Sequence, residues 1–206
     1  DERWRKKAVA ECLSGNPMDA LDLCTGTGDL VLRMARNTNG STNIKALDYS
    51  KPMLKVAKRK ADKMGLDKIE FIHGDAANMP FGEGTFDVIG IGFAFRNLTY
   101  KNPDQKKFLA EINRVLNPGG KFVIIESSQP KNRVLKRLFR FYLRVMVAGL
   151  GGMISGHKGA YRYLAASARN FYTPKEIRNM LLEAGFNAVE HRPFSGGIAG
   201  LTVAVK

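Results

Sequence analysis

The sequence predicts an α/β fold, in which a mostly parallel β-sheet carries helices on both faces. Strand and helix patterns alternate from residue 2 to residue 128, and most of the strand patterns are almost continuously apolar, as expected for strands buried on both faces. A length of 206 residues fits one domain. We therefore expect a single domain, 1–206, with right-handed crossovers between parallel strands.

The five expected strands of the alternating part end in short polar or glycine-containing turns. They cover residues 18–24, 43–49, 68–74, 86–93 and 121–128. Helices are expected at 2–13, 29–36, 52–64 and 103–116. Gly15 with Pro17 ends the first of these helices, Ser50 is a plausible N-cap for the third, and Asn117 to Gly120 forms a turn that closes the fourth.

The last third of the chain departs from this alternation. A helix at 174–184, stopped by Gly185, precedes strands at 186–192 and 197–205. Because only a short loop separates these two strands, we expect them to pair antiparallel at the end of the sheet. Residues 131–170 interrupt the pattern and are interpreted as a helical insertion over the functional site.

Composition excludes several classes of protein. Two cysteines cannot form the disulfide framework of a small secreted domain, and they have no companions at the spacing of a metal site, so we expect no metal. The apolar stretch 145–156 is too short to span a bilayer, which takes roughly 18 to 20 residues. No signal peptide is visible, and a reducing, cytoplasmic location is expected.

The net charge of +14 favours an anionic partner. Residues 131–144 contain six basic residues and no acidic one. Basic and aromatic side chains interleave in a helix expected at 131–146, which can lie on an anionic membrane, on the inner face of the membrane. The alternative is a helix that packs its apolar side on the sheet and exposes its charges.

A glycine turn follows the first expected strand. In the stretch that begins at Asp22, Gly26 and Gly28 allow a sharp turn and a close approach of the backbone to a ligand. The third glycine of a dinucleotide-binding fingerprint would stand at position 31, where this chain has valine. Pyrophosphate binding is therefore disfavoured, and a ligand without a diphosphate is expected.

Acidic residues end the next two strands. Asp48 can accept hydrogen bonds from both hydroxyls of a ribose, and Asp75 can accept one from the exocyclic amine of a base, with room left by Gly74 and Ala76. Three neighbouring strand ends thus suit the parts of a nucleoside. The alternative is that either aspartate only caps a helix or forms a turn.

The motifs together resemble those of class I methyltransferases that bind S-adenosylmethionine. The stretches LDLCTGTGDL, GFAFRNLTYK, RVLNPGGKFVIIESSQP and AYRYL are similar to the C-methyltransferases of ubiquinone and menaquinone biosynthesis. The resemblance implies a Rossmann-like sheet of seven strands with an antiparallel C-terminal strand, and S-adenosylmethionine as cofactor. It places cofactor contacts at Thr27, Asp48, Asp75 and Ala76. The expected cofactor site also includes Asp22, Gly26, Gly28, Tyr49 and Gly92; at Gly92 the family often has serine, so that contact is lost or made by backbone.

The same resemblance directs attention to Arg96 and Asn97, in the loop after the fourth strand. A cation beside a developing phenolate stabilises it, so Arg96 is the candidate for activating a quinol ring, and Asn97 can orient the hydroxyl or a water. Arg96 could instead be structural. His157 is a weaker candidate for the base.

Four functions remain open from the sequence. The first is C-methylation of a demethylated menaquinol or ubiquinol precursor, by an enzyme bound peripherally at the membrane. The second is methylation of another small or prenylated molecule, because the insertion residues at 157, 165 and 166 depart from the family pattern. A nucleic-acid-binding protein is less favoured, since no groove-reading helix or base-stacking set is evident. The fourth is a cofactor-binding module without activity. The oligomeric state is left open.

Overall fold

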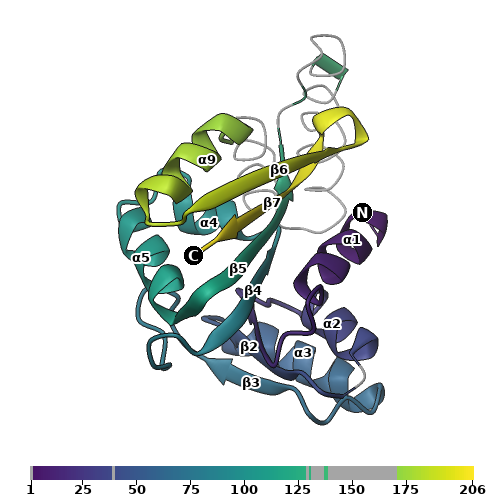
Figure 1. Cartoon of the computed structure of the whole chain (residues 1–206). Coiled ribbons are helices and arrows are strands. Elements are labelled where there is room, and N and C mark those ends of the chain that lie inside the picture. Colours follow the sequence, from purple (N-terminus) through teal and green to yellow (C-terminus); the bar gives the residue numbers. More distant parts are fainter. Residues whose placement is uncertain (1, 39, 129, 131–136, 139–170) are drawn as a thin grey trace.

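The computed structural model describes residues 2–38, 40–128, 130, 137–138 and 171–206 (Figure 1). The helical insertion expected at 131–170, with its basic helix at 131–146 and His157, lies outside the described residues apart from Arg137 and Leu138. Among the described residues, no helix is long and apolar enough to cross a membrane.

Seven strands form one sheet in the order β3-β2-β1-β4-β5-β7-β6. The strands are β1 (Asp19–Leu23), β2 (Asn43–Asp48), β3 (Glu70–His73), β4 (Phe86–Gly92), β5 (Leu116–Ser127), β6 (Ala188–Phe194) and β7 (Ala199–Val205). All neighbours from β3 to β5 pair parallel, whereas β7 pairs antiparallel with both β5 and β6. The expected parallel sheet with one antiparallel C-terminal strand is confirmed.

Helices cover both faces of the sheet (Figure 1). One layer contains α1 (Glu2–Cys12), α2 (Val31–Asn37) and α3 (Lys51–Lys63), and the other contains α4 (Phe95–Thr99), α5 (Gln105–Val115) and α9 (Pro174–Glu183). Each layer buries its own hydrophobic cluster against the sheet. Side chains alternate along a strand, so Leu21 and Leu23 of β1 join the α5 side while Ala20 joins the α1 side.

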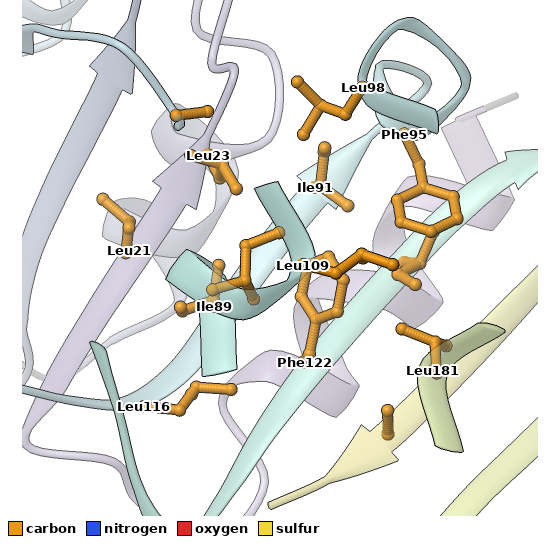
Figure 2. Packing of buried hydrophobic residues seen from close by; sticks show 14 of the residues in the cluster. Leu21, Leu23, Ile89, Ile91, Phe95, Leu98, Leu109, Leu116, Phe122 and Leu181 are labelled. Carbon is orange, nitrogen blue, oxygen red and sulfur yellow. The ribbon is translucent and has the colours of Figure 1, made fainter. Parts of the chain in front are cut away.

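The core on the α5 side is the larger of the two clusters (Figure 2). Phe95 of α4 and Phe122 of β5 meet edge to face, with ring centroids 5.9 Å apart. Leu109 of α5 and Leu181 of α9 pack beside them and are at most 2% exposed. Burial of these side chains, each contributing roughly 1.5–3 kcal/mol, fixes α4 against the sheet.

Two elements differ from the sequence-based expectation. The expected loop after β4 contains the short helix α4, whose Phe95 and Leu98 are buried three residues apart. A helix of this length gives too few repeats for periodicity to reveal it. The turn expected at Asn117–Gly120 is instead the first part of β5. Its backbone pairs with the chain end, Gly119 donating to Lys206 O at 2.9 Å and Lys206 donating to Gly120 O at 3.0 Å.

Candidate active site

A cavity of about 470 Å³ opens where the carboxyl ends of β1, β2 and β4 meet. This volume lies in the range of roughly 300–1,000 Å³ typical of small-molecule sites. Seven of the expected site residues line it: Asp22, Gly26, Thr27, Asp48, Tyr49, Gly92 and Asn97. The topology therefore brings most of the candidates into one cavity.

Asp22, at the end of β1, organises the glycine turn. Its Oδ2 accepts hydrogen bonds from Thr25 Oγ1 at 2.5 Å and from the backbone N–H of Val31 at 3.0 Å. Its Oδ1 is buried and has no hydrogen-bond partner among the described residues. Burial raises the pKa of Asp22 to about 7, against the lowering effect of these two hydrogen bonds. A buried carboxylate oxygen without a partner, on a residue that lines the cavity, suits a cationic group of a ligand.

Asp48 ties the glycine turn to the end of β2. Its Oδ2 accepts from the backbone N–H of Gly26 at 2.7 Å, and its Oδ1 accepts from that of Ser50 at 2.7 Å. Asp48 thus forms a turn and also lines the cavity. Each carboxylate oxygen has a second lone pair, so two ligand hydroxyls can still donate to it.

Gly26 and Gly28 both have positive φ, 57° and 85°, as the turn requires. Gly28 is not part of the cavity wall. A Cβ at Gly28 would lie 3.0 Å from the Cβ of Ala57 in α3. The glycine is therefore needed for close packing between the turn and α3, besides its backbone conformation.

The adenine-side candidates lie apart from the described cavity lining. Asp75 is exposed, and its Oδ1 accepts from the backbone N–H of Ala77 at 2.8 Å, which is the turn-forming role considered as the alternative. Ala76 is buried in the core on the α5 side. Their contact with a base remains a prediction.

The two catalytic candidates have different surroundings. Asn97 is exposed and lines the cavity. Arg96 is 7% exposed and does not line it, and its Nη1 donates to Glu126 Oε1 at 2.7 Å. Its Nε is buried without a partner in the described residues. Arg96 is thus tied to a carboxylate of β5, a structural contact of the kind considered as the alternative to catalysis.

Sequence reasoning missed several residues that line the cavity: Arg5, Cys24, Thr25, Asp29, Leu30, Met53, Phe93, Ala94 and Leu98. Cys24 and Phe93 have positive φ of 54° and 57°, which for a residue with a side chain costs roughly 1–2 kcal/mol. They directly follow β1 and β4, and backbone strain of this kind concentrates at functional sites. No local pattern marks Arg5, because the packing of α1 against the sheet brings it there.

Cys24 does not have the properties of a nucleophile. Burial raises the pKa of its thiol to about 12, with further raising by Asp48, Asp22 and Asp75. The thiol is therefore protonated near neutral pH. Among the described residues, no group of three or more side chains could hold a metal ion.

The fold and the site define a class I S-adenosylmethionine-dependent methyltransferase. Solved structures of the same fold include a SAM-dependent methyltransferase from Aquifex aeolicus, with a TM-score of 0.65 and 22% identity over 91% of this chain and 81% of that one. Another is a putative methyltransferase from Bacillus halodurans, with a TM-score of 0.64 and 20% identity over 98% of this chain and 96% of that one. At these identities the likeness shows the fold.

Relatives of known sequence narrow the class. A demethylmenaquinone methyltransferase of Thermus thermophilus is 40% identical over 203 residues, which is 98% of this chain and 89% of that protein. The protein with the same description in Oceanobacillus iheyensis is 36% identical, over 98% of this chain and 84% of that protein. Residues 1–206 match the ubiE/COQ5 methyltransferase family, and the chain belongs to that family.

The residues present fit S-adenosylmethionine as the cofactor of this methyltransferase. The unpartnered Oδ1 of Asp22 suits the ammonium group of the cofactor, and Asp48 suits its ribose. The glycine turn has no third glycine for a diphosphate, and S-adenosylmethionine has no diphosphate.

Proposed function

We propose that this chain transfers a methyl group from S-adenosylmethionine to a ring carbon of demethylmenaquinol. The proposal is supported by the 40% identity, over 98% of the chain, to the Thermus thermophilus protein described as a demethylmenaquinone methyltransferase. In the reaction the methyl–sulfur bond breaks, a carbon–carbon bond forms to the ring, and a ring proton leaves. The products are S-adenosylhomocysteine, menaquinol and a proton.

The cofactor supplies an activated methyl group when bound, so the protein has to orient the acceptor and exclude water. On this proposal Asn97, exposed in the cavity wall, makes hydrogen bonds that orient the acceptor hydroxyl. Arg96 is buried beside Asn97 and does not line the cavity of the described residues; on the same proposal its Nε–H, which has no described partner, stabilises the developing phenolate. Its charge is already compensated by Glu126, so we assign it a donor role and no role as a bare cation.

The cofactor contacts are proposed from the cavity lining. On this proposal the turn residues Gly26 and Thr27 contact the methionine part of S-adenosylmethionine. Asp48 and Tyr49 contact its ribose and adenine. Gly92 contributes only backbone, where the family often has a serine. Asp75 and Ala76 are proposed at the adenine edge, although neither lines the cavity of the described residues.

We further propose that the protein binds peripherally to an anionic membrane, on its inner, cytoplasmic face. The support is the sequence of 131–146, most of which lies outside the described residues, and the exposure of Leu138, which is 61%. Sedimentation with liposomes, with and without anionic lipid and at rising salt, tests it. Binding that needs the anionic lipid and weakens steeply with salt is expected.

The acceptor is tested by following labelled methyl groups into lipid. The protein, methyl-labelled S-adenosylmethionine and liposomes with either demethylmenaquinol or a demethylated benzoquinol are incubated together. Label in the naphthoquinol is expected. Label only in the benzoquinol would replace the acceptor, and no label in either, with cofactor binding verified by calorimetry, would contradict quinol methylation.

The variant Arg96→Ala tests the assignment of that residue. Cofactor affinity should be retained while methylation falls by roughly tenfold or more, the worth of a hydrogen bond to a charged group. An unchanged rate in the folded variant would remove Arg96 from the mechanism.

A further inference from the structure

Arg5 is brought into the wall of the cavity by α1, far from the other lining residues in sequence. Its guanidinium carbon lies 5.1 Å from the ring centroid of Phe93, which follows β4. Its Nη1 lies 3.8 Å from Asp29 Oδ2, beyond hydrogen-bond distance. The guanidinium is thus held over the aromatic ring by a cation–π contact. The side chain is 20% exposed and lines the cavity.

The charges of the cavity wall are uneven. Three carboxylates line it, those of Asp22, Asp29 and Asp48, and Arg5 is the one basic residue among the described lining residues. Asp29 already accepts a hydrogen bond from Lys60 Nζ at 3.1 Å through Oδ1. Lys60 and Arg5 thus both lie near Asp29, and the guanidinium of Arg5, with its five N–H donors, is the basic group of this wall that can hydrogen-bond a ligand carboxylate.

The charged groups follow the order of the strands. The sheet order β2-β1-β4 puts Asp48 on one side, Asp22 in the centre, and Phe93 with its Arg5 on the other side. A ligand whose ribose lies at Asp48 and whose ammonium lies at Asp22 therefore extends toward Arg5. The α-carboxylate on the same carbon as that ammonium is the one anionic group of S-adenosylmethionine.

We propose that Arg5 binds the α-carboxylate of the cofactor. This inference rests on the chain's binding of S-adenosylmethionine and is independent of which acceptor is methylated. A planar guanidinium can hold a carboxylate through two parallel N–H···O bonds, and its stacking on Phe93 fixes the plane of the group. With Asp22 at the ammonium and Arg5 at the carboxylate, the site binds both charged groups of the methionine part of S-adenosylmethionine.

Calorimetry with two ligands isolates this contact. One ligand is S-adenosylhomocysteine, and the other is its decarboxylated analogue, 5′-deoxy-5′-(3-aminopropylthio)adenosine, which keeps the ammonium and lacks the carboxylate. Binding is measured for the unmodified chain, for Arg5→Gln and for Arg5→Lys. Arg3→Gln is the matched control, because it removes the same charge from an exposed position of the same helix.

Arg5→Gln is expected to lower the affinity for S-adenosylhomocysteine roughly 10- to 100-fold, and the affinity for the decarboxylated analogue hardly at all. Arg5→Lys should recover part of the loss, since lysine keeps the charge without the paired donors. Arg3→Gln should behave like the unmodified chain.

Equal weakening of both ligands by Arg5→Gln would overturn the proposal and indicate lost packing of α1 on Phe93. No weakening of either would also overturn it. Because no acceptor is present, neither result depends on quinol methylation, and a failure of the labelling experiment would leave this measurement valid.

Discussion

Arg96 of α4 and Glu126 of β5 form a buried ion pair, with Nη1 and Oε1 2.7 Å apart and side chains 9% and 3% exposed. Glu126 Oε2 also accepts from the backbone N–H of Arg96 at 3.3 Å, and Oε1 accepts from that of Ser127 at 2.8 Å. One carboxylate therefore fastens the first turn of α4 to the end of β5. Because α4 also carries Asn97, the pair sets the position of a residue in the cavity wall.

Glu126→Gln should destabilise the protein by about 3 kcal/mol, since breaking a buried pair leaves a buried charge uncompensated. Urea unfolding measures the change. Glu70→Gln is the control, because it breaks the more exposed pair between Glu70 and Lys45, which should cost less than about 1 kcal/mol. Equal effects of the two substitutions would show that the Arg96–Glu126 pair does not stabilise the fold.

Asn97→Ala should lower the rate of methyl transfer roughly tenfold or more, because one hydrogen bond to the acceptor oxygen, where charge develops, is lost. Affinity for S-adenosylhomocysteine should be nearly unchanged. Single-turnover kinetics and calorimetry measure the two quantities. Asn37→Ala, at an exposed position of α2, is the control and should alter neither. A full rate in Asn97→Ala would exclude Asn97 from acceptor orientation.

Gly28→Ala should cost more stability than Gly15→Ala, although the two glycines have nearly equal φ of 85° and 83°. An alanine at either position has the same backbone strain from the positive φ, roughly 1–2 kcal/mol. Only at Gly28 does the added Cβ meet a neighbour, Ala57 Cβ at 3.0 Å, whereas nothing lies within 4 Å at Gly15. Unfolding free energies should therefore differ by about 1 kcal/mol or more. Equal losses would mean that the turn shifts away from α3 without cost.

The stability contributed by Asp22 should fall as the pH rises. Burial raises the pKa of Asp22 from an ordinary 3.8 to about 7 in the folded state. Between about pH 4 and pH 7 the carboxyl is therefore protonated in the folded protein and ionised in the unfolded chain. The contribution is complete below pH 4 and is lost through pH 7, with a slope of at most about 1.4 kcal/mol per pH unit. Asp22→Asn should remove this slope and be the more stable form at pH 8.

Urea unfolding at pH 5 and pH 8 measures the slope. Asp19→Asn, on the same strand but half-buried, is the control and should follow the unmodified chain. If Asp22→Asn changed stability equally at both pH values, the carboxyl would not be titrating in this range.

Cofactor affinity should rise with pH for the same reason. The ammonium of S-adenosylhomocysteine favours the ionised form of Asp22, so below pH 7 binding must release a proton from that carboxyl. Between pH 5.5 and 7, affinity should increase by up to about tenfold per unit, below the range of about 7.7–8.0 where an α-amino group titrates. Calorimetry in buffers of different ionisation enthalpy detects the proton. A flat profile in the unmodified chain would contradict an ammonium at Asp22.

The sequence alone determined most of the described elements and their order, apart from α4 and the first part of β5. Apolar strands alternating with helices specified a parallel sheet, and the short loop before the last strand specified its antiparallel pairing. It also predicted that Asp22, Gly26 and Asp48 lie together, as they do in the cavity wall, because carboxyl ends of neighbouring parallel strands meet at one edge. These inferences depend only on local pattern and on a general rule of sheet topology.

Tertiary structure decided the rest, because long-range packing leaves no local pattern. Arg5 reaches the cavity only through the packing of α1, and Glu126 meets Arg96 only because β5 lies beside β4. The same packing buried Arg96 and left its neighbour Asn97 in the cavity wall, since a helix turns successive side chains by about 100°. Asp75, like Asp48, is an aspartate that follows a strand. Its carboxylate accepts a hydrogen bond from Ala77 in its own turn, and it is not among the described residues that line the cavity.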